Sequence, residues 1–463
     1  MKLRVSDLLK INGVQIINGE KIQDSVFTGV SIDSRAVKKN EIFAAIKGER
    51  FDGHNFIKDV FKKGIKTVLV SKKWYKKQVK SSFKNKTLIV AEDTVEGLGE
   101  IARIYRRKFL IPVLAIAGSN GKTSTKDIIA RVLSKKYEVL KTEGNYNNAI
   151  GVPLTLFRLN ESHQFCVIEL GTNHFGEIEY LCRIAKPQFG TVTNIGKEHL
   201  EFLKDLKGVA KAEGELVEYL KQTYGTYFLN YDDEYLRKGM GKEMMNVFSY
   251  GTSAKANVTG RIIKFNTFFP EIEIKYNKHI IRTKLNTIGY QSFLSALSAA
   301  AIGFYFEIPA AQIRKIISEF TPETNKRNDL KNIAGTWVID DTYNSNPDSV
   351  ITALENLKRY NIKGKKHIVL SDMLELGKTS VKEHTEIGRL VKKMKFENLY
   401  TYGEDSYNTF KGAKGLKNNY YFSDKQTLAE FLKLNIKKED AILIKGSRSM
   451  KMEEIISQLT INY

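Results

Sequence analysis

The sequence has few cysteines and prolines and no long hydrophobic run. Its 463 residues include two cysteines, too few for the disulfide framework of a secreted domain. The seven prolines do not gather into a proline-rich linker. No apolar run reaches the roughly 18 residues that a transmembrane helix needs, and charges interrupt residues 1–10, where a signal peptide would have its apolar core. We therefore expect a soluble, cytoplasmic globular protein.

Acidic residues are also scarce relative to basic ones. Lys and Arg number 74 and Asp and Glu number 52, which gives a formal charge of +22. Residues 1–110 alone hold 24 basic and 12 acidic side chains. Such a charge is typical of proteins that bind nucleic acid, an anionic membrane or a phosphate-rich ligand, and also of proteins whose solvated lysines cover the surface. Composition therefore leaves the partner open.

Short apolar runs alternate with longer amphipathic runs along most of the chain. The apolar runs predict buried strands over 112–117, 164–170, 189–195, 226–229, 337–340, 367–370 and 441–444. Helical spacing of apolar residues predicts helices over 125–137, 209–220, 349–359 and 383–394. Alternating strands and helices predict an α/β fold with parallel sheets that helices cover on both faces.

Two polar stretches divide the chain into three parts. The first is the basic stretch 103–108, and the second is the run 321–329. Because domains usually hold about 100–200 residues, we expect domains at 1–107, 108–322 and 323–463.

Residues 116–126, Ile-Ala-Gly-Ser-Asn-Gly-Lys-Thr-Ser-Thr-Lys, carry the strongest functional signal. The glycines allow backbone N–H groups to face an anion, and the N-terminus of the following helix adds partial positive charge. Lys122 supplies a charge for phosphate and Thr123 a hydroxyl for Mg²⁺. Isoleucine stands at 116, where the full phosphate-loop pattern has glycine. The segment predicts a nucleotide site at Gly118, Ser119, Asn120, Gly121, Lys122, Thr123 and Ser124.

Two charged residues follow other predicted strands. Glu169 ends the strand 164–170, and His199 comes shortly after the strand 189–195. A buried carboxylate needs a cation, and ligands of open parallel sheets bind at the carboxyl edge of the strands. We therefore expect both residues beside the phosphate loop, although a lone histidine is more often a packed or surface residue.

Three polar loops also follow predicted strands. The loop 142–154 is rich in asparagine, 338–347 delivers acids and amides into a turn, and 444–450 is basic. Asparagine amides both donate and accept hydrogen bonds, and Lys445 and Arg448 suit an anion. Each loop also fits a solvated strand end without function.

Together, these segments resemble the ATP-dependent Mur ligase family, whose members form amide bonds in peptidoglycan precursor synthesis. The resemblance extends from Ser31-Ile-Asp-Ser-Arg35 to residues 445–453, and 144–154, 340–347 and 372–377 resemble the member that acts on the tripeptide precursor. It implies three α/β domains: a small N-terminal UDP-binding domain, a central P-loop ATPase domain with a parallel sheet, and a C-terminal Rossmann-like domain.

The resemblance also implies an activity. It is the ATP-dependent addition of D-alanyl-D-alanine to UDP-MurNAc-tripeptide through an acyl phosphate, with ATP and Mg²⁺ as cofactors. The implied enzyme is monomeric and cytoplasmic, without nucleic-acid or membrane partners. The sequence leaves open whether the tripeptide carries lysine or diaminopimelate. A sister ligase for another amino acid or for folate, and a basic P-loop protein that binds nucleic acid, are the alternatives.

The family's functional positions transfer to named residues of this chain. The implied metal ligands are Thr123, Glu169 and His199. The implied ATP contacts outside the phosphate loop are Ser295, Asn325, Arg327, Asp341, Tyr343 and Asn344. The implied substrate contacts are Ser34, Arg35, Asn147, Asn148, Lys445 and Arg448.

The chain departs from the family at three places, one of which is Ser371, where the family usually has glycine before Asp372. On the helix after His199 the family usually carries a carbamylated lysine, but Glu213 stands there and Lys211 lies two positions earlier. Positions two apart face different ways on a helix, so we expect Glu213 to supply the negative charge directly and to act with Lys122, Glu169 and His199 in catalysis. Ser292 and Ser295 replace the usual asparagines, which leaves the adenine contacts open.

Overall fold

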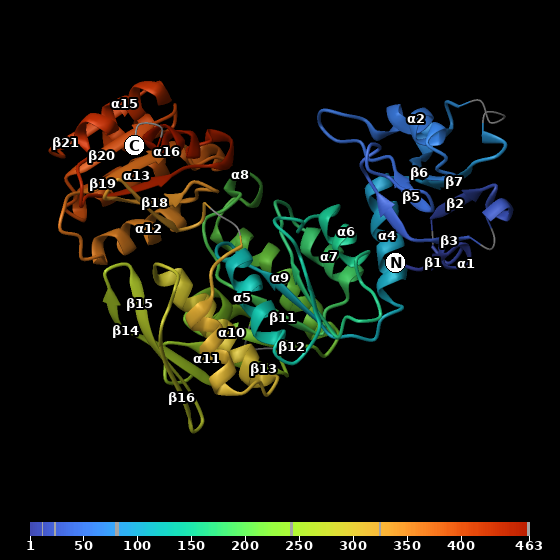
Figure 1. Ribbon diagram of the computed structural model, residues 1–463, viewed down its shortest axis with the longest axis horizontal. Helices are drawn as coiled ribbons and strands as arrows, with labels where there is room; N and C mark the ends of the chain where they lie inside the picture. The colour runs from blue at the N-terminus through green and yellow to red at the C-terminus, as the bar shows by residue number, and fades with distance from the viewer. Residues whose placement is uncertain (12, 23–24, 79–82, 241–243, 324–325, 461–463) are drawn as a thin grey trace.

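The computed structural model describes residues 1–11, 13–22, 25–78, 83–240, 244–323 and 326–460. Each of the three predicted parts of the chain has its own main sheet, and the central part lies between the other two (Figure 1). The N-terminal part lies at the right of this view and the C-terminal part at the upper left. Within the described ranges, no helix combines the length and the apolar character needed to span a bilayer.

The N-terminal sheet has the order β2-β7-β6-β5-β4 and is parallel except where β2 pairs with β7. Its strands are β2 (Val14–Ile17), β4 (Gly29–Ser31), β5 (Glu41–Ala44), β6 (Thr67–Ser71) and β7 (Thr87–Ala91). A two-stranded ribbon joins β1 (Leu3–Arg4) and β3 (Val26–Phe27), and the helices are α1 (Val5–Leu8), α2 (Ile57–Lys62), α3 (Lys72–Tyr75) and α4 (Thr94–Arg106). Asp93 caps α4, which packs against the central part.

The central sheet has nine strands in the order β16-β15-β14-β13-β12-β11-β8-β10-β9. The strands are β8 (Val113–Ala117), β9 (Val139–Lys141), β10 (Phe165–Glu169), β11 (Phe189–Val192), β12 (Thr226–Asn230), β13 (Val247–Gly251), β14 (Val258–Asn266), β15 (Phe269–Tyr276) and β16 (His279–Lys284). The helices are α5 (Lys122–Leu133), α6 (Gly151–Leu156), α7 (Glu177–Ala185), α8 (Leu200–Leu203), α9 (Leu206–Gln222), α10 (Tyr290–Tyr305) and α11 (Ala310–Glu319). Alternate residues of β8 enter two different apolar clusters, one on each face, which explains its continuous apolar sequence.

The C-terminal sheet has the order β17-β18-β22-β19-β20-β21. Its strands are β17 (Asp329–Ile333), β18 (Thr336–Asp341), β19 (Lys366–Ser371), β20 (Asn398–Tyr402), β21 (Asn418–Phe422) and β22 (Ala441–Lys445). Its helices are α12 (Pro347–Arg359), α13 (Ser380–Lys393), α14 (Ser406–Gly412), α15 (Lys425–Asn435) and α16 (Glu453–Thr460). Asn346 caps α12 by accepting from Ser349 N at 2.8 Å, and Pro347 begins the helix.

The structure confirms the predicted strands and helices and the α/β class, with one difference at the sheet edges. The inner strands are parallel, whereas β2, β15, β16 and β17 pair antiparallel with their neighbours. The reason is local, because a two-residue turn that begins with Asn277 at φ 50° joins β15 to β16 and leaves no room for a crossover helix. The chain passes between sheets in the α4–β8 and α11–β17 connections, where the domain boundaries at 107/108 and 322/323 stay a prediction.

Both cysteines are buried and unpaired. Cys166 lies in β10, in the buried strand that the sequence predicts, and Cys182 lies in α7. Burial raises the pKa of the Cys166 thiol to about 12, so neither position offers an accessible thiolate for chemistry.

Candidate active site

The phosphate loop connects β8 to α5 and requires glycine at two positions. Gly118 has φ 115° and Gly121 has φ 79°. A Cβ at Gly118 would lie 2.3 Å from Thr193 Oγ1, and one at Gly121 would lie 2.2 Å from Gln291 Nε2. A side chain at either position would therefore strain the backbone; at Gly118 it would also clash with the backbone of Thr193, and at Gly121 it would displace the flexible end of Gln291.

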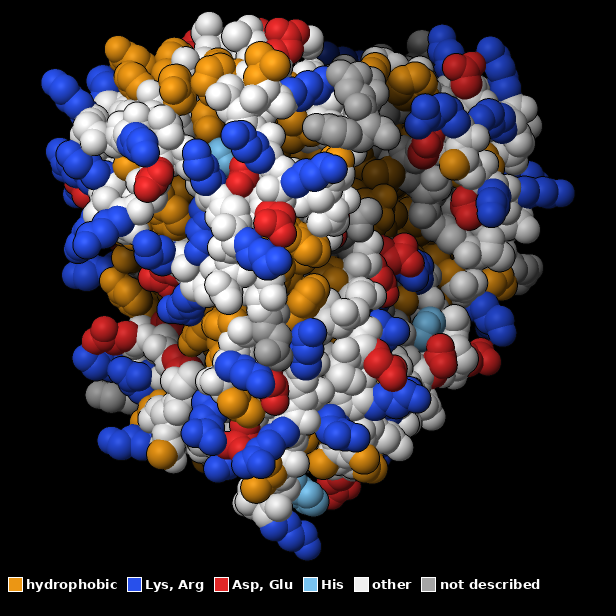
Figure 2. Space-filling view, turned by 60° about the vertical axis from the view of Figure 1, so that its left-hand side comes forward, with side chains coloured by type: hydrophobic (Ala, Val, Ile, Leu, Met, Phe, Trp, Pro, Cys, Tyr) orange, Lys and Arg blue, Asp and Glu red, His pale blue; other side chains and the backbone are white. Residues whose placement is uncertain are grey.

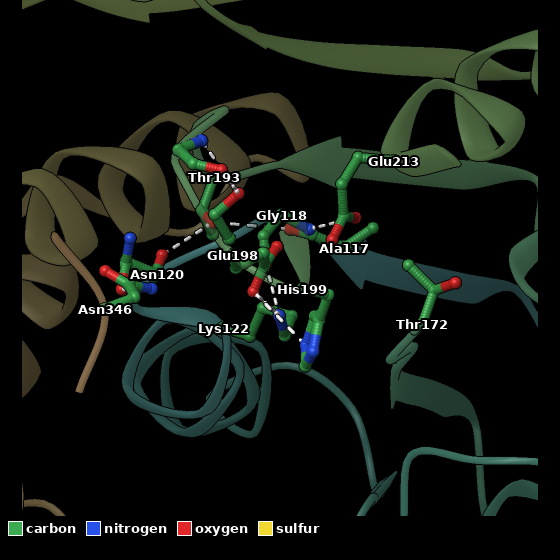
Figure 3. Close-up of polar contacts among 12 residues, drawn as sticks. Ala117, Gly118, Asn120, Lys122, Thr172, Thr193, Glu198, His199, Glu213 and Asn346 are labelled. Carbon is green, nitrogen blue, oxygen red and sulfur yellow. Dashed lines mark hydrogen bonds and ion pairs between the residues drawn. The ribbon is translucent and has the colours of Figure 1, made fainter. Parts of the chain in front are cut away.

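The segment after β11 holds the phosphate loop in place. Asn194 O accepts from Ser119 N at 2.9 Å, and Asn194 Oδ1 accepts from Asn120 N at 3.1 Å. Thr193 Oγ1 donates to Asn120 O at 2.7 Å. On its other side, Asn120 Oδ1 accepts from Asn346 Nδ2 of the C-terminal part at 3.1 Å (Figure 3). The loop is thus fixed from two elements that are far away in sequence.

Lys122 lies at the start of α5 among three carboxylates. Its Nζ donates to Gly118 O and lies 3.7 Å from Glu198 Oε2 (Figure 3). Burial alone would lower the pKa of Lys122, but Glu198, Glu213 and Glu169 together raise it. The lysine therefore keeps its positive charge at the point where phosphates would meet the loop.

Glu169 ends β10 and is almost completely buried. Its Oε1 accepts from Asn147 Nδ2 at 2.9 Å and from Thr123 Oγ1 at 3.3 Å. Its Oε2 has no hydrogen-bond partner and lies 3.7 Å from Lys126 Nζ. A buried carboxylate oxygen without a hydrogen bond is costly unless a cation approaches it.

Glu213 projects from α9 onto the phosphate loop and is fully buried. Its Oε2 accepts from Gly118 N at 2.6 Å (Figure 3). Burial raises the pKa of Glu213 to about 8, with Glu198 adding to the rise and Lys122 opposing it. Lys211 instead faces outward, with its Nζ 5.3 Å from the centre of the Phe175 ring. Glu213, not Lys211, thus occupies the place beside the loop.

His199 lies just before α8 with a left-handed backbone, φ 49°. Its Nε2 is 3.8 Å from Glu198 Oε2, and its Nδ1 bonds to Glu375 Oε2 of the C-terminal part. Hydrogen bonding to His199 lowers the pKa of Glu375. The ring of His199 therefore contacts the C-terminal part through Nδ1 and faces the buried Glu198 through Nε2.

These side chains form one wall of a cavity of about 990 Å³ between the central and C-terminal parts. The predicted site residues that line it are Ser119, Asn120, Gly121, Lys122, Ser124, Asn147, Asn148, Glu169, His199, Ser295, Arg327, Asp341, Tyr343, Asn344 and Lys445. Gly118, Thr123 and Glu213 are buried directly behind this wall. The cavity is large enough for a nucleotide with part of a second substrate.

The C-terminal residues line the opposite wall. The Arg327 guanidinium stacks 3.8 Å from the centre of the Tyr343 ring. Lys445 is buried and donates to Asp341 Oδ2 at 2.6 Å and to Asn344 O at 2.9 Å. Lys445 therefore already neutralises a neighbouring acid and holds the loop after β18.

Three further predicted site residues lie outside the cavity lining, and a fourth lies outside the described residues. Ser34 and Arg35 follow β4 and do not line the cavity, and the exposed Arg35 pairs with Asp33 at 2.9 Å. Arg448 pairs with Glu453 at 2.8 Å and also lies outside the cavity lining. Asn325 lies outside the described residues.

Two further predicted residues have structural partners. Asn148 Oδ1 accepts from Gly151 N at 2.9 Å and so supports the start of α6. Ser295 is buried, and its hydroxyl bonds to Thr125 Oγ1 at 3.0 Å between α10 and α5. This bond engages the Ser295 hydroxyl in helix packing.

Sequence reasoning missed four residues of the site: Glu198, Gln291, Asn346 and Glu375. Glu198 directly precedes His199, and its buried Oε1 has no hydrogen bond. That adjacency was the available signal for Glu198. Asn346 and Glu375 lie in segments 340–347 and 372–377, which the resemblance had marked without giving these residues a role, and Gln291 lies at a helix start where nothing local singles it out.

A phosphate loop beside buried carboxylates at the carboxyl edge of a parallel sheet, faced by a second doubly wound sheet, defines a nucleotide-dependent enzyme. The sequence matches the Mur ligase family, catalytic domain, over residues 26–106, the Mur ligase middle domain over 116–303, and the Mur ligase, glutamate ligase domain over 326–448. The chain belongs to the Mur ligase family, which confirms the resemblance.

Similar proteins share one name. The UDP-N-acetylmuramoyl-tripeptide–D-alanyl-D-alanine ligase of Bacillus subtilis is 32% identical over 440 residues, 94% of each chain. The Escherichia coli protein of that name is 32% identical over 453 residues, 96% of this chain and 97% of the relative.

Solved structures of similar proteins have the same fold as this chain. MurF from Acinetobacter baumannii superposes with a TM-score of 0.89 at 25% identity and 99% coverage of both chains. MurF ligase from Thermotoga maritima in complex with ADP gives 0.82 at 25% identity, with coverage of 93% of this chain and 96% of that one. The predicted α/β architecture is thereby confirmed.

Proposed function

We propose that this chain joins D-alanyl-D-alanine to UDP-MurNAc-tripeptide with the hydrolysis of ATP to ADP and phosphate, giving the UDP-MurNAc-pentapeptide precursor of peptidoglycan. One observation carries the proposal. The phosphate loop, Glu169 and His199 meet in a single cavity, in a chain that matches, over 94% of its length, a relative named for this reaction.

ATP binds with its phosphates against the loop 118–124. Lys122 and the N-terminus of α5 neutralise phosphate charge. Arg327, stacked on Tyr343, lies on the opposite wall and brings a second cation to the nucleotide. Because the Ser295 hydroxyl already bonds Thr125, we expect the base to be read by other polar groups of α10, with Gln291 in the cavity lining as the first candidate.

The donor set around Glu169 suits Mg²⁺. Thr123 offers a hydroxyl, His199 an imidazole, and Glu169 a buried carboxylate oxygen that lacks a hydrogen bond. Among the described residues no three His, Cys, Asp or Glu side chains cluster into a metal site, so phosphates and water would have to complete the shell of the ion. When bound, Mg²⁺ would neutralise the phosphate charge.

Glu213 takes the place of the modified lysine beside the loop, and its acid group, whose pKa burial raises to about 8, becomes a full negative charge when a bound cation favours its ionised form. Its bond to Gly118 N and its complete burial support this role. A crystal structure tests it, because electron density for a carbamate on Lys211 would contradict the assignment.

The reaction needs an activated carboxylate. The tripeptide carboxylate attacks the γ-phosphorus of ATP, and an acyl phosphate and ADP form. The amine of D-alanyl-D-alanine then attacks the acyl carbon, and the tetrahedral intermediate collapses with loss of phosphate. Lys122 balances the negative charge that gathers during both steps, while the C-terminal wall shields the acyl phosphate from water.

The remaining substrate contacts extend from the phosphate loop toward the N-terminal part. Asn147, hydrogen-bonded to Glu169, and Asn148 face the tripeptide, and Ser34 and Arg35 hold the uridine diphosphate. Lys445 holds Asp341 in place, and Arg448, which now pairs with Glu453, turns to the substrate when it binds. Arg35→Ala is expected to raise the KM for the UDP-substrate while the KM for ATP stays unchanged.

An ADP-release assay tests the activity. We expect turnover with UDP-MurNAc-tripeptide and D-alanyl-D-alanine, and background release with single amino acids or with folate as acceptor. Turnover with a single amino acid would identify a sister ligase. Parallel reactions with lysine and diaminopimelate tripeptides determine the third-residue preference, and light scattering during gel filtration tests the proposed monomer.

A further inference from the structure

The segment 193–203 links the phosphate loop to the C-terminal part. At one end, Asn194 bonds the backbone of the loop. At the other end, Leu200 and Leu203 of α8 belong to an apolar cluster that also contains Met373 and Leu376. Figure 1 shows α8 reaching from the central part to the C-terminal part. The position of His199, in the middle of this segment, therefore depends on both parts.

The contact between His199 and Glu375 is made by side chain and backbone together. Glu375 Oε2 bonds His199 Nδ1, and Glu375 O accepts from Glu201 N at 3.0 Å. A Cβ at the neighbouring Gly377 would lie 3.1 Å from Glu201 Cα, so the two backbones are in close contact. The carboxylate is thus held in place by its own main chain when it meets the ring.

A carboxylate on Nδ1 fixes the tautomer of an imidazole. When Nδ1 carries the proton and donates it to Glu375, the lone pair remains on Nε2, which is the nitrogen on the side of Glu198 and Lys122. Metal-binding histidines commonly use one nitrogen in this way and are oriented by the partner of the other.

We infer that Glu375 is a positioning residue for His199, and that the orientation of this histidine toward the metal and phosphates depends on contact with the C-terminal part. The inference rests on the proposed function. It adds that Glu375, which does not line the cavity, orients the histidine from the C-terminal part, so that the metal site is complete only when the two parts are docked.

The same contact surface offers a matched control. Lys197 Nζ pairs with both oxygens of Glu383 at 2.9 and 2.8 Å, and Glu383 is nearly buried. This pair also joins the central and C-terminal parts, two residues from His199, but its bonds are to Lys197. Glu383→Gln therefore changes another ion pair of the same contact surface while the bond between Glu375 and His199 stays in place.

The experiment compares Glu375→Gln with Glu383→Gln in the full chain. Mn²⁺ binding is measured from the EPR signal of free Mn²⁺, with a non-hydrolysable ATP analogue and UDP-MurNAc-tripeptide present, and kcat and KM are measured separately. We expect Glu375→Gln to weaken Mn²⁺ binding and to lower kcat by about ten-fold or more, with the KM for ATP nearly unchanged. The amide oxygen that Glu383→Gln introduces can still accept from Lys197 Nζ, so this variant should change Mn²⁺ binding and kcat by less than about three-fold.

Two further variants make the result decisive. If Glu375 acts through His199, adding Glu375→Gln to His199→Ala should cause no additional loss, and Glu375→Asp, which keeps a shorter carboxylate, should lie between Glu375→Gln and the unaltered protein. Unaltered Mn²⁺ binding in Glu375→Gln, or an equal loss in Glu383→Gln, would overturn the inference. If the unaltered protein releases no ADP with D-alanyl-D-alanine, the proposed function fails, and the Mn²⁺ comparison still decides the role of Glu375.

Discussion

At the residue scale, the positive charge of Lys122 lies among buried acidic side chains of the site. Lys122, Glu198 and Glu213 lie close together, and a carboxylate oxygen of each acid has no hydrogen-bond partner. Two neighbouring carboxylates cannot both ionise easily in a buried setting with one cation. The proton that this group retains makes its behaviour sensitive to pH and to bound cations.

The first prediction concerns Glu213 and pH. Its pKa in the folded protein is about 8, against an ordinary 4.5, so between these values the folded state holds a proton that the unfolded state has lost. The free energy of unfolding should therefore fall as pH rises through this window. Glu213→Gln cannot titrate, so its dependence should be flatter in denaturant unfolding curves from pH 5 to 8 without nucleotide. Glu218 is exposed on the same helix, so Glu218→Gln should show the same dependence of unfolding free energy on pH as the unaltered protein. The prediction is contradicted if Glu213→Gln shows that same dependence too.

At the scale of elements, two helix starts build the cavity walls. α5 begins at the phosphate loop, and α12 begins directly after its cap Asn346, whose side chain also bonds Asn120. Each helix start combines backbone N–H groups with partial positive charge. The structure of these short turns therefore decides where the phosphates can lie.

The second prediction concerns the turn before α5. Gly121→Ala should cost about 1–2 kcal/mol in backbone strain and should also displace Gln291, so ATP affinity should fall by an order of magnitude or more. Gly64→Ala is the control, since Gly64 has φ 83° but no atom within 4 Å of a Cβ. Calorimetric titration with an ATP analogue should show normal affinity for the control. Equal affinities in both variants would mean that the loop adapts to the added methyl group.

The third prediction separates two roles of Asn346. Asn346→Asp keeps the oxygen that caps α12 but loses the amide donor to Asn120, so stability should hold while the apparent affinity for ATP falls several-fold. Asn346→Ala loses both and should also cost about 1 kcal/mol of stability. Thermal unfolding and nucleotide titration of the two variants test this separation. Equal nucleotide affinity in Asn346→Asp and the unaltered protein would show that the bond to Asn120 is dispensable.

At the scale of the whole molecule, the charge of +22 is spread widely. Figure 2 shows Lys and Arg distributed over the face in view, with Asp and Glu among them. The basic excess is largest in residues 1–110, which the proposed function assigns to the UDP-sugar. Much of the charge therefore acts as solvated surface, and a smaller part can attract an anionic substrate.

The fourth prediction follows from that distribution. If the N-terminal excess steers the substrate, kcat/KM for UDP-MurNAc-tripeptide should fall several-fold as salt shortens the Debye length from about 10 Å at 0.1 M to about 3 Å at 1 M. D-alanyl-D-alanine is a zwitterion without net charge, and its kcat/KM serves as the control in the same steady-state assay. Equal salt dependence for both substrates would contradict steering.

Local sequence patterns determined most of the fold and the centre of the site. Buried strands such as 113–117 are continuous apolar runs, and helices such as α9 repeat apolar residues at helical spacing, so both can be read without tertiary information. The phosphate loop is equally local, because its glycines, lysine and threonine are consecutive. Glu169 and His199 were predictable as strand-end residues in a parallel sheet.

Only the tertiary structure decided which distant groups meet that centre. Glu213 reaches Gly118 across 95 positions, and Glu375 reaches His199 across 176. Such contacts depend on strand order and on how the central and C-terminal parts dock, and no local periodicity encodes either. The sequence thus determined the groups that we propose to bind phosphate, whereas packing between distant segments decided which acids are buried beside them and how the histidine is held.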